Sequence, residues 1–62
     1  MNYYQKMRAI LERRPFPLAE AVALSAEIQT AEDSGTELTQ HEERQWAKLT
    51  EEILRHTPKA NL

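Results

Sequence analysis

Proline and glycine divide this sequence into three segments. Pro15 and Pro17 flank Phe16, Gly35 is the only glycine, and Pro58 lies close to the C-terminal end. Proline does not continue a helix and biases the preceding residue away from helical dihedrals, and glycine commonly ends a helix. Between these breaks apolar residues recur at spacings of three and four, which is typical of amphipathic helices. The sequence therefore predicts an all-α fold of three helices.

The first two helices are predicted at residues 2–14 and 17–34. The first ends before the first proline, because the residue before a proline disfavours helical dihedrals. Pro17 suits the first turn of the second helix, where a missing N–H donor costs nothing, and Gly35 suits its C-terminal cap. The two apolar stripes consist of Tyr3, Met7, Ile10 and Leu11, and of Leu18, Ala21, Leu24, Ile28 and Ala31.

The third helix is predicted at residues 40–56. It begins at a capping-box pattern, Thr39 followed three residues later by Glu42, in which each side chain accepts a hydrogen bond from the other residue's backbone N–H. Its apolar stripe is Trp46, Leu49 and Ile53, with Leu54 widening it.

The connection between the second and third helices is short, which favours an antiparallel helical hairpin. The shorter N-terminal helix is expected to pack across this hairpin or to reach a second subunit. Residues 1–58 are expected to form a single helical domain, and residues 59–62 a flexible tail.

A chain of 62 residues without cysteine has few ways to supplement a small core. A domain of this size buries only about 60% of the surface that its unfolded chain exposes. Disulfides and thiolate metal sites are excluded, and two histidines are too few for a structural zinc site. What remains is well-packed helices or self-association, and we expect self-association, most often as a symmetric dimer.

The sequence shows no catalytic constellation. His41 and His56 each follow a glutamate by four residues, a spacing that lets imidazole and carboxylate share a metal. The two histidines would lie about 22 Å apart along a helix, so one protomer cannot place both on one ion. Neither serine lies in a Gly-x-Ser-x-Gly motif, and one glycine is too few for a phosphate-binding loop. We therefore expect no enzyme, no metal site and no cofactor.

Charge is segregated along the chain. Residues 1–16 carry four basic side chains and one acidic, residues 17–43 carry seven acidic and neither Lys nor Arg, and residues 44–62 carry four basic and two acidic. Aromatic residues beside basic ones in the first segment are the mixture that binds phosphates and stacks on bases. A small nucleic-acid-binding regulatory protein that uses the basic N-terminal helix is therefore the alternative function, although the acidic middle segment counts against it.

No stretch of the sequence approaches the roughly 20 apolar residues of a membrane span. The first residues also lack the uninterrupted apolar core of a secretory signal. We expect a cytoplasmic protein without a membrane partner.

Trp46 is either the centre of a helical core or the anchor of a protein interface, and both hold if a second subunit completes the core. We expect a non-catalytic protein-interaction module, homodimeric, acting as a small helical adaptor, regulator or inhibitor. Its charge segregation would steer a partner's approach. On size alone, a phage- or plasmid-encoded modulator is one form of such a protein. The candidate partner-binding residues are Tyr3, Tyr4, Met7, Arg13, Arg14, Phe16 and Trp46.

Overall fold

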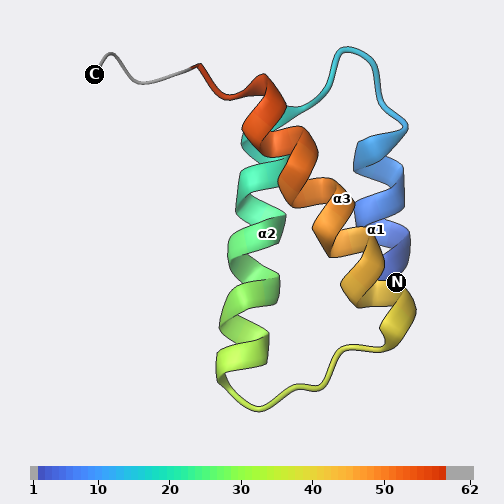
Figure 1. Ribbon diagram of the computed structural model, residues 1–62, viewed down its shortest axis with the longest axis vertical. Coiled ribbons are helices and arrows are strands. Elements are labelled where there is room, and N and C mark those ends of the chain that lie inside the picture. Colours follow the sequence, from blue (N-terminus) through green and yellow to red (C-terminus); the bar gives the residue numbers. More distant parts are fainter. Residues whose placement is uncertain (1, 59–62) are drawn as a thin grey trace.

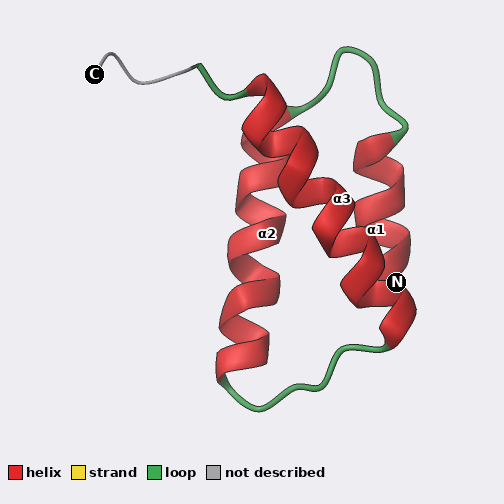
Figure 2. Ribbon diagram, in the orientation of Figure 1, coloured by secondary structure: helices red, strands yellow, loops and turns green. Residues whose placement is uncertain are grey.

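Three helices make up the computed structural model, which describes residues 2–58 (Figure 1). Helix α1 covers Tyr3–Leu11, α2 covers Leu18–Asp33 and α3 covers Gln40–His56. The part of the chain described contains only helices, turns and loops (Figure 2), which confirms the predicted all-α fold with a shorter first helix. The predicted tail, residues 59–62, lies outside the described residues.

The bundle runs up, down and up. Helices α1 and α2 lie roughly antiparallel, and α3 crosses both of them diagonally (Figure 1). All three pairs of helices contact one another, and the contact between α1 and α3 is the most extensive. The first and third helices, which are farthest apart in the sequence, are therefore the closest packed.

The end of α2 and the start of α3 are fixed by local hydrogen bonds. Gly35 adopts a φ of +100°, and the N–H of Thr36 donates to the carbonyl of Ala31 at 3.0 Å, as in a Schellman motif. At the start of α3 the capping box is complete. The N–H of Glu42 donates to the Thr39 hydroxyl at 3.1 Å, and the N–H of Thr39 donates to the Glu42 carboxylate at 2.8 Å.

Helix α1 ends at Leu11, three residues before the predicted end. The carbonyl of Leu11 would accept a helical hydrogen bond from the N–H of residue 15, but that residue is proline and has no N–H. The guanidinium of Arg14 supplies the missing donor, with its Nη1 at 2.9 Å from the Leu11 carbonyl oxygen and 2.8 Å from that of Arg13. The Arg14–Pro15 peptide bond is cis.

A compact apolar core forms where the three helices meet. Helices α1 and α3 each contribute one buried side chain and α2 contributes three. No buried side-chain nitrogen or oxygen among residues 2–58 lacks a hydrogen-bond partner. The buried residues are Met7, Ala21, Leu24, Ile28 and Leu49, and those packed partly buried against them are Tyr3, Ile10, Leu11, Phe16, Leu38, Trp46 and Ile53.

Two leucines of α3 provide a test of this core. Leu49 is fully buried, whereas Leu54 is 71% exposed on the same helix. Leu49→Ala is expected to lower the free energy of unfolding by about 2–5 kcal/mol, because it removes buried methyl groups and leaves a cavity. Leu54→Ala, measured by urea denaturation at low protein concentration, is expected to change it by less than about 0.5 kcal/mol. Equal losses for both variants would contradict this arrangement.

Candidate interaction surfaces

Met7 is the one candidate partner-binding residue that lies wholly in the core. Its exposed fraction is 0%, and it packs with buried residues of α2 and α3. A side chain with no exposed atoms offers nothing to a partner in this conformation. Met7 is therefore part of the core and of no surface of the bundle.

The aromatic candidates of α1 and the connector contact other parts of the chain. The ring of Tyr4 meets that of His41 edge-on, with 6.3 Å between centroids, and Phe16 stacks on His56 at 4.6 Å. The ammonium of Lys6 lies 5.6 Å from the Tyr3 ring centroid. Both histidines thus contact aromatic rings near the ends of α3. Sequence spacing could not have suggested these contacts, because the rings come from distant segments.

Two basic side chains of the N-terminal segment are paired with the acidic helix α2. Arg13 forms an ion pair with Glu20, and the ammonium of Lys6 lies 3.5 Å from the Glu27 carboxylate. All four side chains are partly exposed, so each pair contributes at most about 1 kcal/mol. The pairs show that part of the charge segregation is used within the chain. They also reduce the excess positive charge that α1 offers to other molecules.

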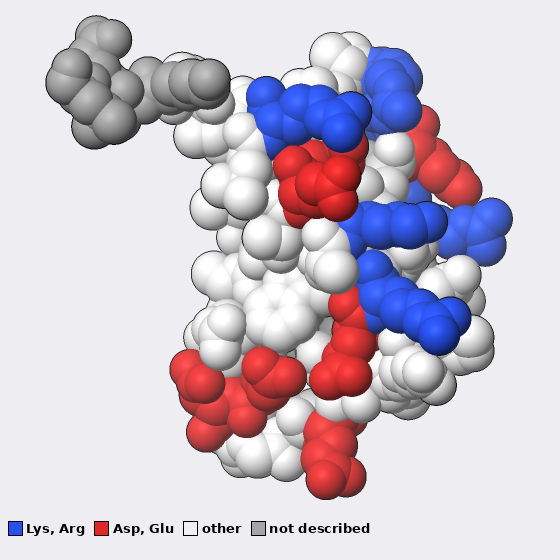
Figure 3. All heavy atoms as spheres, viewed as in Figure 1, with Lys and Arg blue, Asp and Glu red and all other residues white. Residues whose placement is uncertain are grey.

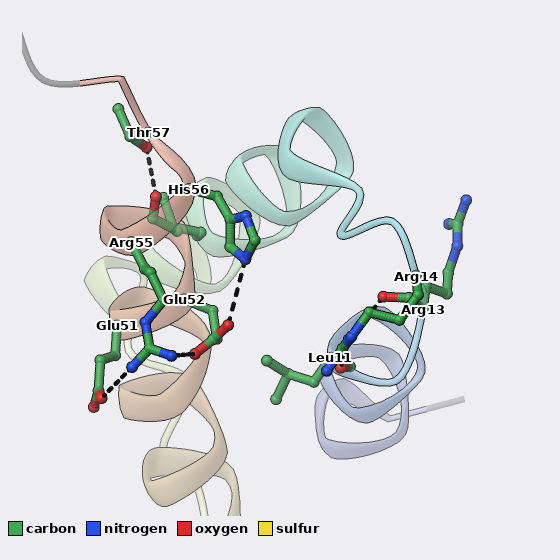
Figure 4. Close-up of polar contacts among 9 residues, drawn as sticks. Leu11, Arg13, Arg14, Glu51, Glu52, Arg55, His56 and Thr57 are labelled. Atoms are coloured by element: carbon green, nitrogen blue, oxygen red, sulfur yellow. Dashed lines mark hydrogen bonds and ion pairs between the residues drawn. The ribbon is translucent and has the colours of Figure 1, made fainter.

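Four of the other basic residues, Arg8, Arg14, Lys48 and Arg55, line an open groove between α1 and α3. Figure 3 shows basic side chains along this side of the molecule, and Figure 4 shows Arg55 on one side of the groove and Arg14 on the other. Arg55 pairs with Glu51 at 3.7 Å and with Glu52 at 3.6 Å. Arg14 and Lys48 form no ion pair with any residue in the range 2–58. The α1–α3 groove is lined by Arg8, Leu11, Glu12, Arg14, Gln45, Lys48, Glu51, Glu52 and Arg55.

A second hollow lies between α2 and α3, and it lacks the charged residues that line the α1–α3 groove. Its seven lining residues are all uncharged. Leu54 is 71% exposed and Val22 is 47% exposed at this hollow, and these two are the exposed large hydrophobic residues of the described chain. The lining residues are Val22, Ser25, Ala26, Gln29, Thr50, Ile53 and Leu54.

Trp46 is joined to this hollow by a hydrogen bond to Ser25, one of the lining residues. Its side chain is partly buried against the core, and its indole Nε1–H donates to the hydroxyl of Ser25 at 3.0 Å. The indole packs on the core and keeps part of its surface accessible, so both roles that the sequence left open stay compatible with the structure. We call the seven lining residues together with Trp46 the α2–α3 surface.

Among the residues of the α2–α3 surface, the sequence analysis named only Trp46 as a partner-binding candidate. Val22 and Leu54 carried a signal, since each is a large apolar residue beside, rather than within, the main stripe of its helix. An apolar residue at the edge of a stripe can face either the core or solvent, and only the angle between the helices decides which.

Comparison with models of known protein families, with curated proteins and with solved structures gave no match. None of α1–α3 has the combination of length and apolar character that crossing a bilayer requires, in the part of the chain described. Within the same residues, no three His, Asp or Glu side chains cluster so that they could hold a metal ion.

The hydrogen bond between Trp46 and Ser25 can be tested directly. Ser25→Ala removes the acceptor and leaves the indole N–H without a protein partner. The free energy of unfolding is expected to fall by about 1 kcal/mol, and the emission of this single tryptophan should shift. The control is Ser34→Ala, because Ser34 caps α2 through its backbone N–H. An unchanged stability and emission in Ser25→Ala would show that this bond contributes nothing.

Proposed function

We propose that this protein is a non-catalytic interaction module that forms a homodimer through the α2–α3 surface. The observation that carries the proposal is the pair of exposed side chains, Leu54 and Val22, beside an uncharged hollow. Exposed apolar area is favourably removed from water, at about 25 cal/mol for each Å² buried. A second copy offers the same combination of a protruding leucine and a hollow.

The shapes of the side chains support a contact between two helical surfaces. Ser25, Ala26 and Thr50 are small, so they let another helix approach closely between the larger Val22 and Leu54. In a two-fold interface the same patch serves both copies, and Leu54 of each copy can enter the hollow of the other. Trp46, which is bonded to Ser25, is the residue type that most often carries binding energy at such contacts.

A cytoplasmic adaptor, regulator or inhibitor is the role that fits such a dimer. Pairing through the α2–α3 surface leaves the charged α1–α3 groove of each copy accessible, because the groove lies on the other side of α3. Charged groups of this kind act mainly on the rate and specificity of encounter with a further protein partner. The dimer would therefore present two equivalent charged grooves.

Leu54→Glu tests the dimer. A carboxylate in place of the exposed leucine would have to be desolvated on association, so the variant should be monomeric at tens of micromolar, where the unchanged protein is dimeric. Sedimentation equilibrium measures both. Gln40→Glu is the matched control, because it adds the same charge to an exposed position of α3 outside the α2–α3 surface. A monomeric unchanged protein, or a Leu54→Glu variant that still associates, would refute the proposal.

Binding of a polyanion such as nucleic acid is the second candidate function, and the α1–α3 groove is the observation that favours it. The groove brings Arg8 and Arg14 from the N-terminal segment next to Lys48 and Arg55 of α3. This differs from the site expected on the N-terminal helix alone, since Lys6 and Arg13 are paired with acids of α2. Carboxylates in the same groove oppose this function, so it ranks second.

Lys48→Ala tests the groove. Lys48 forms no ion pair with residues 2–58, so its removal should weaken binding to single-stranded DNA at low salt. It should also reduce the slope of log K against log salt by about 0.7 if one phosphate contact is lost. Lys6→Ala, which removes a lysine already paired with Glu27, should change binding less. Absence of any binding at low salt, measured by fluorescence anisotropy, would exclude this function.

A further inference from the structure

The α1–α3 groove holds both signs of charge, and the way these charges are paired indicates what the groove can bind. We propose that it binds an acidic segment of another protein, in which carboxylates flank an apolar side chain. The proposal rests on the protein-interaction role given above, for which it supplies the chemistry of the further partner. It does not depend on the dimer formed through the α2–α3 surface.

The carboxylates of the groove are all paired with basic groups of the same chain. Glu12 pairs with Arg8 at 3.2 Å, and Glu51 pairs with Arg55 at 3.7 Å. Glu52 pairs with the same Arg55 at 3.6 Å. These three are the acidic residues that line the groove. A basic ligand would therefore have to compete with ion pairs that the chain already makes.

Two basic groups of the groove, Arg14 and Lys48, have no acidic partner within residues 2–58. Arg14 is held in place, because its Nη1 donates to the carbonyl oxygens of Leu11 and Arg13. A guanidinium has five N–H donors and Nη1 carries two of them, so Nε and Nη2 keep three for a ligand. A carboxylate can accept two of these in parallel, which is a strong and directional form of ion pair.

An apolar side chain lies beside this guanidinium. Leu11 is the last residue of α1, packs partly buried against the core and lines the groove. Arg14 is bonded to the carbonyl oxygen of Leu11, so the two residues are close neighbours. A ligand that reaches Arg14 with a carboxylate can therefore bury an apolar group against Leu11 and gain affinity from it. An amphipathic protein segment presents both kinds of group together.

A nucleic-acid strand fits this pattern less well. Residues 45–55 of α3 border the groove over about 15 Å, at 1.5 Å for each residue. A strand with a phosphate about every 3.4 Å would place roughly four phosphates along that length. Arg14 and Lys48 can pair with two of them, and the others would approach the carboxylates of Glu12, Glu51 and Glu52. A protein segment can carry its carboxylates singly, so it avoids this repulsion.

Two fluorescent probes of equal net charge test the proposal on the full chain. The first is a peptide in which glutamates alternate with leucine and alanine, and the second is an oligodeoxythymidine. At low salt the peptide should bind with the lower dissociation constant, as measured by fluorescence anisotropy, and its glutamine-for-glutamate version should bind much more weakly. Tighter binding of the oligonucleotide would refute the proposal in favour of nucleic acid, and a peptide that does not bind would refute it outright.

Lys48→Gln and Arg44→Gln show where the peptide binds. Both residues are exposed on α3 and neither forms an ion pair within residues 2–58, but only Lys48 lines the groove. Lys48→Gln should raise the dissociation constant of the peptide about two- to fivefold, as expected for one exposed pair. Arg44→Gln, which removes the same charge from the same helix, should leave it unchanged. Equal effects would show binding by net charge alone and would overturn the proposal.

Sedimentation equilibrium on the same samples separates this proposal from the dimer. A protein that dimerises but does not bind the peptide would overturn the groove proposal alone. A monomeric protein that binds the peptide, and loses affinity in Lys48→Gln, would overturn the dimer and support the groove. Circular dichroism of each variant verifies that the helices remain formed.

Discussion

The whole fold depends on one small cluster in which each helix contributes at least one fully buried side chain. Met7 from α1, Ile28 from α2 and Leu49 from α3 have no exposed surface, and the remaining buried residues come from α2. Helices of 9 to 17 residues are marginal in water on their own, so each one is held mainly by this shared contact. Helix α2 supplies three of the five buried residues, while α1 and α3 make the most extensive contact with each other.

Packing on α2 also determines how the charges are used. The acidic helix α2 meets the basic N-terminal segment, and the pairs Lys6–Glu27 and Arg13–Glu20 result. Arg8 and Arg14 of the N-terminal segment instead line the α1–α3 groove, together with Lys48 and Arg55 of α3. The third side of the bundle, between α2 and α3, is uncharged in its middle and holds the exposed Leu54. The three helix pairs thus produce three chemically different faces.

Features that depend on a few neighbouring residues could be predicted from the sequence, and features that join distant residues could not. The complete capping box at Thr39 and the positive φ of Gly35 are properties of a few neighbouring residues, so the end of α2 and the start of α3 could be predicted closely. Where α1 ends early, the Leu11 carbonyl accepts its hydrogen bond from the side chain of Arg14, whose orientation no periodicity reveals. The stacking of Phe16 on His56 joins residues 40 positions apart, and a pattern of apolar spacing carries no information about such a pair.

The sequence by itself determined the class of fold, because proline and glycine limit where helices can run and apolar spacing requires each helix to bury one side. It also determined the segregation of charge, because that is a property of residue order alone. Only the tertiary structure decided which charges neutralise each other and which face stays apolar. That outcome depends on the angle at which α3 crosses α1 and α2, and the angle places Met7 inside, Leu54 outside and Trp46 at the boundary between them.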